Sequence, residues 1–265
     1  MRKRFWWITC ALLAFSVTII SWRAESSKTH HNTIAKSARL SSKELFSRYV
    51  YEIYNNAQLN STGLDLDVFQ KAVTGYFNLK ASNKVSQYSS IITIVDLAKS
   101  SREKRLWIVD LINKDLLLNT WVAHGNGSGD DVPSHFSNER DSYASSLGFY
   151  VTDDIYHGKH GRSLKLDGMD IGFNDNARAR SIVVHGAKYV SPGTINALGR
   201  LGHSEGCPAV SPKVVDKVIN TIKGKNVLFI NGNDYSYTSK YLDEDVAINY
   251  VYPGSGANNT LNASL

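Results

Sequence analysis

The spacing of apolar residues changes near Tyr88, and this change decides the class of fold. Before it, apolar residues recur every four positions, as at Leu45, Tyr49 and Ile53. This spacing is typical of one face of a helix. Residues 41–44, Ser-Ser-Lys-Glu, have the pattern of a capping box that begins such a helix. After Tyr88 the apolar runs are short and rich in β-branched residues, which favours strands.

The chain after Tyr88 is therefore expected to be mainly β. The segments expected to form strands are residues 91–95, 105–112, 116–123, 148–151, 181–184 and 226–230. Residues 113–115, Asn-Lys-Asp, are typical of a hairpin turn. Another helix is expected to begin at Ser211-Pro212 and to end at Gly224. With a further helix predicted over residues 65–77, the sequence indicates an α+β fold in which a small helical segment precedes a mainly β domain.

The first residues predict that the chain is exported. Residues 1–4 begin the chain with Met-Arg-Lys-Arg, and residues 5–22 are mostly apolar and carry no charge. This is the pattern of a secretory signal, and the apolar run is also long enough to span a bilayer. A cleaved signal peptide and a retained signal-anchor both remain open. In either case the remainder is expected to be periplasmic or otherwise extracytoplasmic, secreted or anchored to the inner membrane through residues 5–22.

The charge of the chain argues against nucleic acid as a partner. The formal net charge is +6, but Arg2, Lys3, Arg4 and Arg23 lie in the targeting segment, and removing these four leaves +2. No dense cluster of Lys and Arg remains, so nucleic-acid binding is not expected. The segments that we distinguish are residues 1–24 as signal peptide or signal-anchor, 25–40 as linker, 41–85 as helical lead-in, 86–233 as the mainly β domain, and 234–265 as a partly disordered C-terminal extension.

Cys207 is the residue most informative about function. The chain has two cysteines, and the other, Cys10, lies in the apolar N-terminal segment. The part predicted to be exported therefore has a single thiol, which cannot form an internal disulfide. Three roles remain open: a nucleophile, a zinc ligand together with His203 and His185, or a small buried hydrophobe. The chain lacks the Cys-x-x-Cys spacing that structural zinc sites usually supply, so no metal is expected.

His185 is the natural general base for this thiol. It follows the strand-like run 181–184 and precedes Gly186, so a strand would deliver its imidazole to a sheet edge. A free thiol has a pKa of about 8.5, and a nearby protonated imidazole is expected to lower the pKa of Cys207.

The turn around Cys207 offers further groups. The N–H groups of Gly206 and Cys207 are expected to face a developing oxyanion. Ser204 is expected to hydrogen-bond either the imidazole or the turn. The planar Arg200 guanidinium suits a substrate carboxylate.

These residues resemble the signature of the L,D-transpeptidase catalytic domain family, the YkuD type, and within it the murein branch. That signature places a histidine first and then Ser/Thr-His-Gly-Cys, which here corresponds to His185 followed by Ser204, Gly206 and Cys207. Further segments that carry the resemblance are residues 123–129, 145–150, 158–164, 184–191 and 206–210, so it extends over about 91–230. The sequence departs from the pattern at Glu205, where the signature has histidine, and at His203, where this branch usually has arginine. Glu205 is expected to point to solvent.

The resemblance implies a domain of mixed sheets with one or two helices, and an acyl transfer that needs no cofactor. Cys207 would attack the third residue of a peptidoglycan tetrapeptide stem, release D-alanine and form a thioester. An amine acceptor would then resolve the thioester to give a 3-3 crosslink, with His185 moving the proton. An L,D-carboxypeptidase or amidohydrolase on the same fold and a catalytically idle wall-binding module remain as alternatives.

The roles of four other polar residues are less specific. Tyr189 is expected to line the cleft, and His124 to have a structural or substrate-cleft role. His160 is expected in an exposed loop. Arg180 is equally compatible with a structural role.

Overall fold

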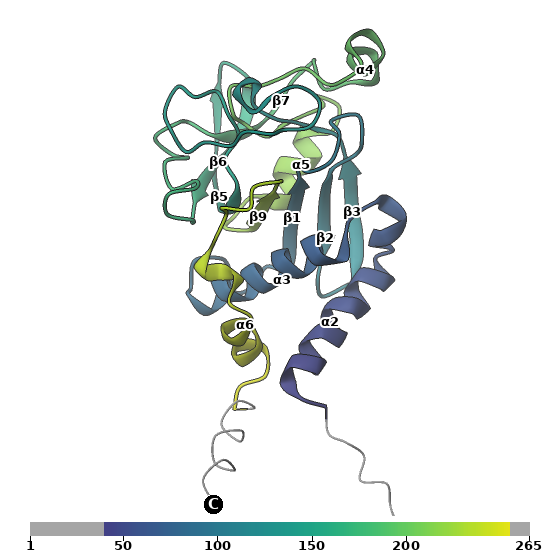
Figure 1. Ribbon diagram of the computed structural model, residues 1–265, viewed down its shortest axis with the longest axis vertical. Coiled ribbons are helices and arrows are strands. Elements are labelled where there is room, and N and C mark those ends of the chain that lie inside the picture. Colours follow the sequence, from purple (N-terminus) through teal and green to yellow (C-terminus); the bar gives the residue numbers. More distant parts are fainter. Residues whose placement is uncertain (1–39, 255–265) are drawn as a thin grey trace, which may run out of the picture. The chain divides into compact units, whose positions relative to one another are not determined.

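The computed structural model describes residues 40–254 (Figure 1). The predicted signal or anchor, nearly all of the predicted linker and the last residues of the C-terminal extension lie outside the described residues. The helices are α2 (Ser42–Asn56), α3 (Leu66–Ala81), α4 (Pro192–Leu198), α5 (Val215–Ile222) and α6 (Glu244–Val251). The strands are β1 (Ile91–Asp96), β2 (Leu106–Asp110), β3 (Asp115–Thr120), β4 (Val122–Ala123), β5 (Gly148–Gly158), β6 (Gly161–Gly168), β7 (Val183–Gly186), β8 (Ala209–Val210) and β9 (Val227–Asn231). Within residues 40–254, every helix is too short or too polar to cross a membrane.

Helix α2 begins at the capping box that the sequence predicts. The Ser41 hydroxyl accepts from the Glu44 N–H at 3.2 Å, and the Glu44 carboxylate accepts from the Ser41 N–H at 2.7 Å. This reciprocal pair satisfies N–H groups that have no partner inside the helix. The apolar face of α2 is buried at Phe46, Val50 and Ile53. The helix predicted from residue 65 is α3, with Asp65 as its N-cap.

The strands form one nine-stranded mixed sheet in the order β3-β2-β1-β9-β5-β6-β7-β8-β4. The β1–β9 and β7–β8 pairs are parallel, whereas the other neighbouring pairs are antiparallel. β3 and β4 occupy the two ends of this order although only Trp121 separates them in the chain. The sheet must therefore curl until its two edges approach each other, which makes it nearly barrel-like. The predicted α+β class with a mixed sheet and a preceding helical segment is confirmed.

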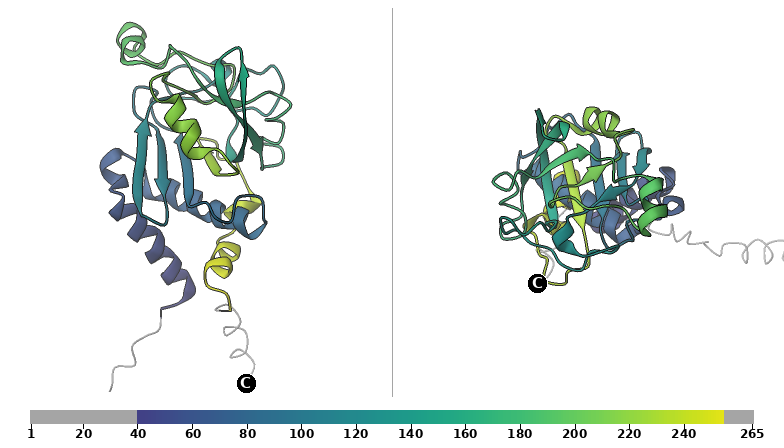
Figure 2. Two further views of the ribbon diagram at one scale, coloured as in Figure 1. Left: turned by 180° about the vertical axis from the view of Figure 1, so that it is seen from behind. Right: turned by 90° about the horizontal axis from the view of Figure 1, so that it is seen from above.

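Alternate residues of the strands face two different apolar layers, as the pleat requires. One face packs against α2, α3 and α6, and its members include Ile92, Ile94, Trp107, Val109, Phe149, Val227 and Phe229. The other face packs against α5, and its members include Val95, Leu106, Ile108, Tyr150, Leu228 and Ile230. Figure 2 shows α5 lying against the sheet when the molecule is seen from behind. The helical segment thus shares a core with the sheet, while the domain boundary near residue 86 stays a prediction.

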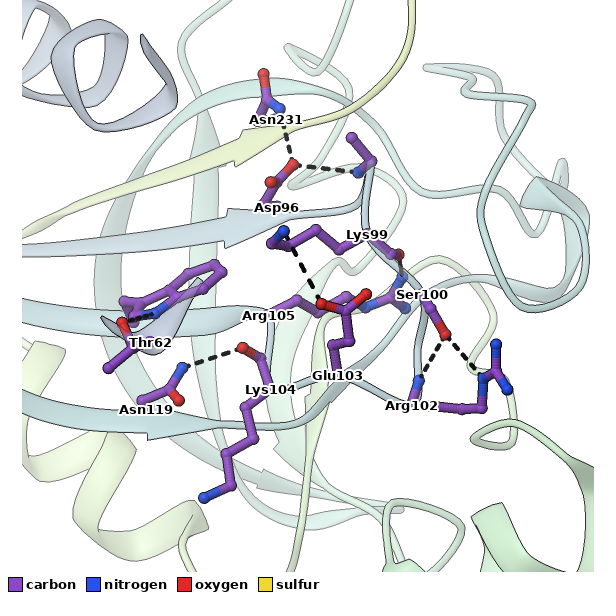
Figure 3. Close-up of polar contacts among 12 residues, drawn as sticks. Thr62, Asp96, Lys99, Ser100, Arg102, Glu103, Lys104, Arg105, Asn119 and Asn231 are labelled. Atoms are coloured by element: carbon purple, nitrogen blue, oxygen red, sulfur yellow. Dashed lines mark hydrogen bonds and ion pairs between the residues drawn. The ribbon is translucent and has the colours of Figure 1, made fainter. Parts of the chain in front are cut away.

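Polar contacts fix the loop between β1 and β2 (Figure 3). Asn231 donates to the Asp96 carboxylate at 2.8 Å, and the Arg105 guanidinium donates to the Lys99 carbonyl at 2.7 Å. The Ser101 hydroxyl, on the same loop, accepts from the Leu201 N–H at 3.0 Å. This contact ties the loop to the segment that leads into the Cys207 turn.

The structure differs from the sequence-based expectation at several elements. The run 116–123 is not one strand, because the chain turns at Trp121 and passes from β3 to β4. Helix α5 begins at Val215 rather than at Ser211-Pro212, because the Val214 and Val215 N–H groups both bond the Ser211 carbonyl in a turn that precedes the helix. Four helices and strands, β6, β8, α4 and α6, were not predicted. Helix α6 packs on α3 within the segment expected to be a C-terminal extension.

Candidate active site

The parallel pair β7–β8 brings Cys207 and His185 to one cavity. His185 is in register with Ala209, and Cys207 precedes Ala209 by two positions. The pairing therefore holds the turn that carries Cys207, just before β8, beside β7. The side chains of Cys207 and His185 both line a cavity of about 760 Å³. β7 is labelled near the top of Figure 1, far from the start of α2.

The sulfur of Cys207 is seated on the segment that precedes β7. The Val183 N–H points at Sγ at 3.5 Å, and Sγ lies 3.8 Å from the Ser181 carbonyl oxygen, which is the acceptor for the thiol proton. Ser181 has φ 57°, the left-handed conformation that is uncommon outside glycine. This conformation lies in the short stretch of backbone that supplies both contacts to the sulfur.

Gly206 and Ser204 shape the turn that carries the thiol. Gly206 has φ 109°, and a Cβ there would lie 2.7 Å from the Ala144 carbonyl oxygen. The Ser204 hydroxyl donates to the Cys207 carbonyl at 2.6 Å and accepts from the Gly206 N–H at 3.2 Å. Of the two roles expected for Ser204, the structure therefore shows the turn and not the imidazole. The expectation for Gly206 is corrected as well, because its N–H already has a partner.

The N–H of Cys207 itself remains available. Within residues 40–254 it has no hydrogen-bond acceptor. It is therefore the candidate oxyanion donor that the turn retains.

His185 is buried and held in one tautomer. Its Nδ1 lies 3.1 Å from the Gly186 carbonyl oxygen. A carbonyl only accepts, so Nδ1 carries the proton and Nε2 keeps a lone pair. Burial is the main cause that lowers the pKa of His185 to about 4, and the neighbouring His160 and Lys159 lower it further. The imidazole is therefore neutral near pH 7 and able to accept a proton.

The charges around the thiol correct the expectation for its pKa. Burial raises the pKa of Cys207, and this effect exceeds the lowering caused by the Val183 N–H and by the Arg180 guanidinium. Glu205 raises the pKa as well. The sequence predicted a thiol activated by a protonated imidazole. The structure instead places a neutral thiol and a neutral imidazole at the same cavity, because burial disfavours the charged form of each.

Arg180 is a part of the site that sequence reasoning left undecided. It lines the same cavity, and its guanidinium donates to the carbonyls of Ser137 and Ala144 at 2.7 Å each. It also donates to the hydroxyls of Ser142 and Ser146. Arg180 thus fastens the loop 137–146 beside the Cys207 turn and adds a fixed positive charge to the cavity. No spacing or motif in the sequence indicates this.

The other predicted site residues divide into two groups. Tyr189 and Arg200 line the cavity as expected. Gly186 lies next to His185, and its carbonyl oxygen accepts a hydrogen bond from Nδ1–H. His124 does not line the cavity: it is buried behind it, where its Nε2 donates to the Gly129 carbonyl at 3.1 Å. Its own carbonyl accepts from the Ser204 N–H at 2.9 Å, so its role is to support the turn.

The residues that depart from the family signature both line the cavity. Glu205 is exposed, as expected, and pairs with Lys159 at 2.9 Å. His203 contacts Asn126 and the Asp130 carbonyl. Among residues 40–254, no group of three or more His, Cys, Asp and Glu side chains is placed to hold a metal ion.

Comparison with known proteins found a matching family model and several similar solved structures. A family model described as L,D-transpeptidase catalytic domain matches residues 60–231. No curated protein matches the chain. Similar solved structures include an L,D-transpeptidase from Mycobacterium smegmatis, with 10% identity and a TM-score of 0.33 over 54% of this chain and 59% of that one. An L,D-transpeptidase (Yku) from Stackebrandtia nassauensis has 15% identity and a TM-score of 0.34 over 65% of this chain and 68% of that one. The helical cell shape determining protein Pgp2 from Campylobacter jejuni has 11% identity and a TM-score of 0.38 over 66% and 61%. The chain thus spans less than two thirds of the length of the first and the third.

Proposed function

Because this chain belongs to the family of L,D-transpeptidase catalytic domains, we propose that it transfers an acyl group from a peptidoglycan stem peptide through a thioester on Cys207. The observation that carries the proposal is the shared cavity of Cys207 and His185, with a free lone pair on the imidazole. A catalytically idle binding module would not need a base held in this tautomer beside a thiol.

The first half of the reaction forms the thioester. His185 Nε2 accepts the proton of Cys207 Sγ as the sulfur attacks the carbonyl carbon of the third stem residue. Negative charge develops on the carbonyl oxygen, and the Cys207 N–H, which has no acceptor within residues 40–254, is the donor that we propose for it. The tetrahedral intermediate then collapses. The C–N bond to D-alanine breaks, and His185 returns its proton to the departing amine.

The second half consumes the thioester. The acceptor amine attacks the thioester carbonyl and gives a proton to His185 Nε2. The C–S bond breaks, the sulfur takes the proton back, and a new amide links donor and acceptor. With a second stem as acceptor the product is a 3-3 crosslink. With water as acceptor it is a shortened stem.

The charges of the cavity suit a peptide that carries carboxylates. Arg180 and Lys159 lie near the thiol, with Lys159 paired to Glu205. The Arg200 guanidinium lines the same cavity, and its acidic partner among the described residues is the exposed Asp130, at 3.6 Å. We propose Arg200 as an anchor for a stem carboxylate, because its fork matches that group.

Two measurements on the purified protein test the proposal. Incubation with a carbapenem should add the mass of one acyl group to the intact protein, and the addition should be absent in Cys207→Ala. Incubation with stem tetrapeptides should give crosslinked dimers, or shortened monomers if water is the acceptor. An unchanged mass, under conditions in which a thiol reagent does label Cys207, contradicts the proposal.

We propose further that residues 5–22 export the chain and place the domain outside the cytoplasm. The basic residues 2–4 and the uncharged, mostly apolar run that follows them support this. The mass of the N-terminus of the mature protein distinguishes a cleaved signal from a retained anchor. Recovery of the full-length chain in the cytoplasmic fraction contradicts export.

The low pKa of His185 predicts an unusual acid limit for the reaction. The imidazole accepts a proton only when it is neutral, and its pKa of about 4 keeps it neutral above that value. The kcat/KM of thioester formation should therefore fall only as the pH drops through about 4, rather than through the ordinary histidine value of about 6.5. A pH profile of adduct formation measures this, and half-loss near 6.5 would refute the burial argument.

A further inference from the structure

We propose that His160 is a positioning residue that holds the imidazole of His185 for catalysis, and that an ion pair between Lys159 and Glu205 keeps His160 in place. The proposal rests on the proposed function of His185 as the base. It concerns the tip of the β5–β6 hairpin, residues 158–161, where the sequence predicted an exposed loop for His160.

The hairpin tip reaches across the catalytic face of the sheet. β6 pairs with β7, with Ser163 opposite His185. The turn Lys159-His160 closes the β5–β6 hairpin between the paired Gly158 and Gly161. Gly161 has φ 74°, which glycine adopts without strain. This geometry folds the exposed His160 back over its neighbour strand instead of extending it into solvent.

The rings of His160 and His185 are stacked. Their centroids lie 4.1 Å apart and the ring planes differ by 22°. The Nδ1 bond to Gly186 fixes one edge of the His185 ring, and the His160 ring covers one of its faces. Together these contacts restrict both rotation and tilt of the imidazole, which keeps Nε2 directed into the cavity.

The ion pair between Lys159 and Glu205 joins the same hairpin tip to the Cys207 turn. Lys159 Nζ lies 2.9 Å from Glu205 Oε2, and both side chains are exposed. Exposed ion pairs are weak and are screened by salt. The contact therefore closes the tip reversibly. Glu205, which stands where the family signature has histidine, acquires a role as the partner that the hairpin binds.

The groups around His185 determine what loss of the stack would do. Lys159 and His160, on the hairpin tip, both lower the pKa of His185. The other titratable or charged residues that line the same cavity are Arg140, Asp141, Tyr156, Arg180, Tyr189, Arg200, His203, Glu205 and Cys207. The His160 ring excludes water from the imidazole. Without this ring, water reaches the imidazole, and its protonated form becomes less unfavourable.

The experiment compares three variants for kcat/KM of thioester formation across pH. His160→Ala should lower kcat/KM by about tenfold, short of the ~10²-fold that a misplacement of 1 Å can cost. It should also move the acid limb of the profile, the pH range in which kcat/KM falls on acidification, upward toward the ordinary histidine pKa of about 6.5. His160→Phe keeps a flat ring over His185 and should retain most of the activity and the low acid limb. His157→Ala is the matched control, because His157 lies on the same hairpin, is exposed and does not line the cavity.

The ion pair is tested separately. Glu205→Gln breaks the pair but keeps the charge of Lys159, which by itself lowers the pKa of His185, and it should reproduce the upward shift of the acid limb at low salt. In the wild type, raising the salt concentration should produce the same shift, and in Glu205→Gln added salt should have a smaller effect. A merely structural role for the hairpin predicts lower thermal stability with an unchanged pH profile. That result overturns the inference, as does a His160→Phe variant that behaves like His160→Ala.

The design separates this inference from the function on which it rests. If transfer persists in Cys207→Ala, the proposed function fails. If transfer requires Cys207 but His160→Ala keeps the wild-type rate and acid limb, only the role of His160 fails.

Discussion

Replacement of His185 by glutamine is expected to slow thioester formation by about 10²–10⁴-fold, the usual contribution of a general base. Glutamine retains a donor for the Gly186 carbonyl, but it has no basic lone pair to take the thiol proton. Burial raises the pKa of Cys207, so the thiol does not ionise by itself at neutral pH. Loss of the base therefore lowers the rate of thioester formation by the full contribution of the base. The measurement is the rate of adduct formation by intact mass, at fixed carbapenem concentration.

Two controls make the His185 result decisive. Raising the pH should partly restore the rate of His185→Gln, because hydroxide in solution then ionises the thiol. His157→Gln should have the wild-type rate. If His185→Gln stays within about tenfold of the wild type at neutral pH, Cys207 is already a thiolate there, and the fixed charge of Arg180 rather than the imidazole activates it.

The parts of the fold that could be predicted are those encoded locally. The capping box at Ser41 and Glu44 names both of its partners within one turn of helix, and the structure has both hydrogen bonds. The hairpin between β2 and β3 follows from a turn between two apolar runs. Cys207 and His185 could be singled out because each stands at the end of a recognisable segment, and both line the cavity.

The parts that could not be predicted depend on which strands become neighbours. Trp121 gives no sign that β3 and β4 lie at opposite ends of the sheet, because curling of the sheet is a property of the whole. His160 lies over His185 only because β6 pairs with β7. Arg180 looks like any exposed arginine until the loop 137–146 is folded around it. Helix α6 packs on α3, which lies far from it in the sequence, so this contact could not be predicted from a local pattern either.

Arg105 supports the active site from behind, and its replacement by methionine is expected to cost about 3 kcal/mol of unfolding free energy. The side chain is 0% exposed. It donates to the carbonyls of Lys99, drawn in Figure 3, and Val122, at 2.7 and 3.2 Å, and to Nδ1 of His124 at 2.7 Å. Methionine fills most of the space but leaves these buried acceptors unsatisfied, at about 1–3 kcal/mol each.

A second effect keeps the cost for Arg105 at the lower end of that sum. Burial lowers the pKa of Arg105 to about 10, because removing this cation from water costs the folded protein free energy. Methionine carries no charge, so the variant does not have this desolvation cost. Urea unfolding measures the net change. Arg162→Met, which breaks the surface contacts with Asp216 and Asn220, should change stability by less than about 0.5 kcal/mol. Because the His124 carbonyl holds the Ser204 N–H, Arg105→Met should also slow thioester formation. A loss of stability equal to that of Arg162→Met would show that the buried guanidinium is replaceable.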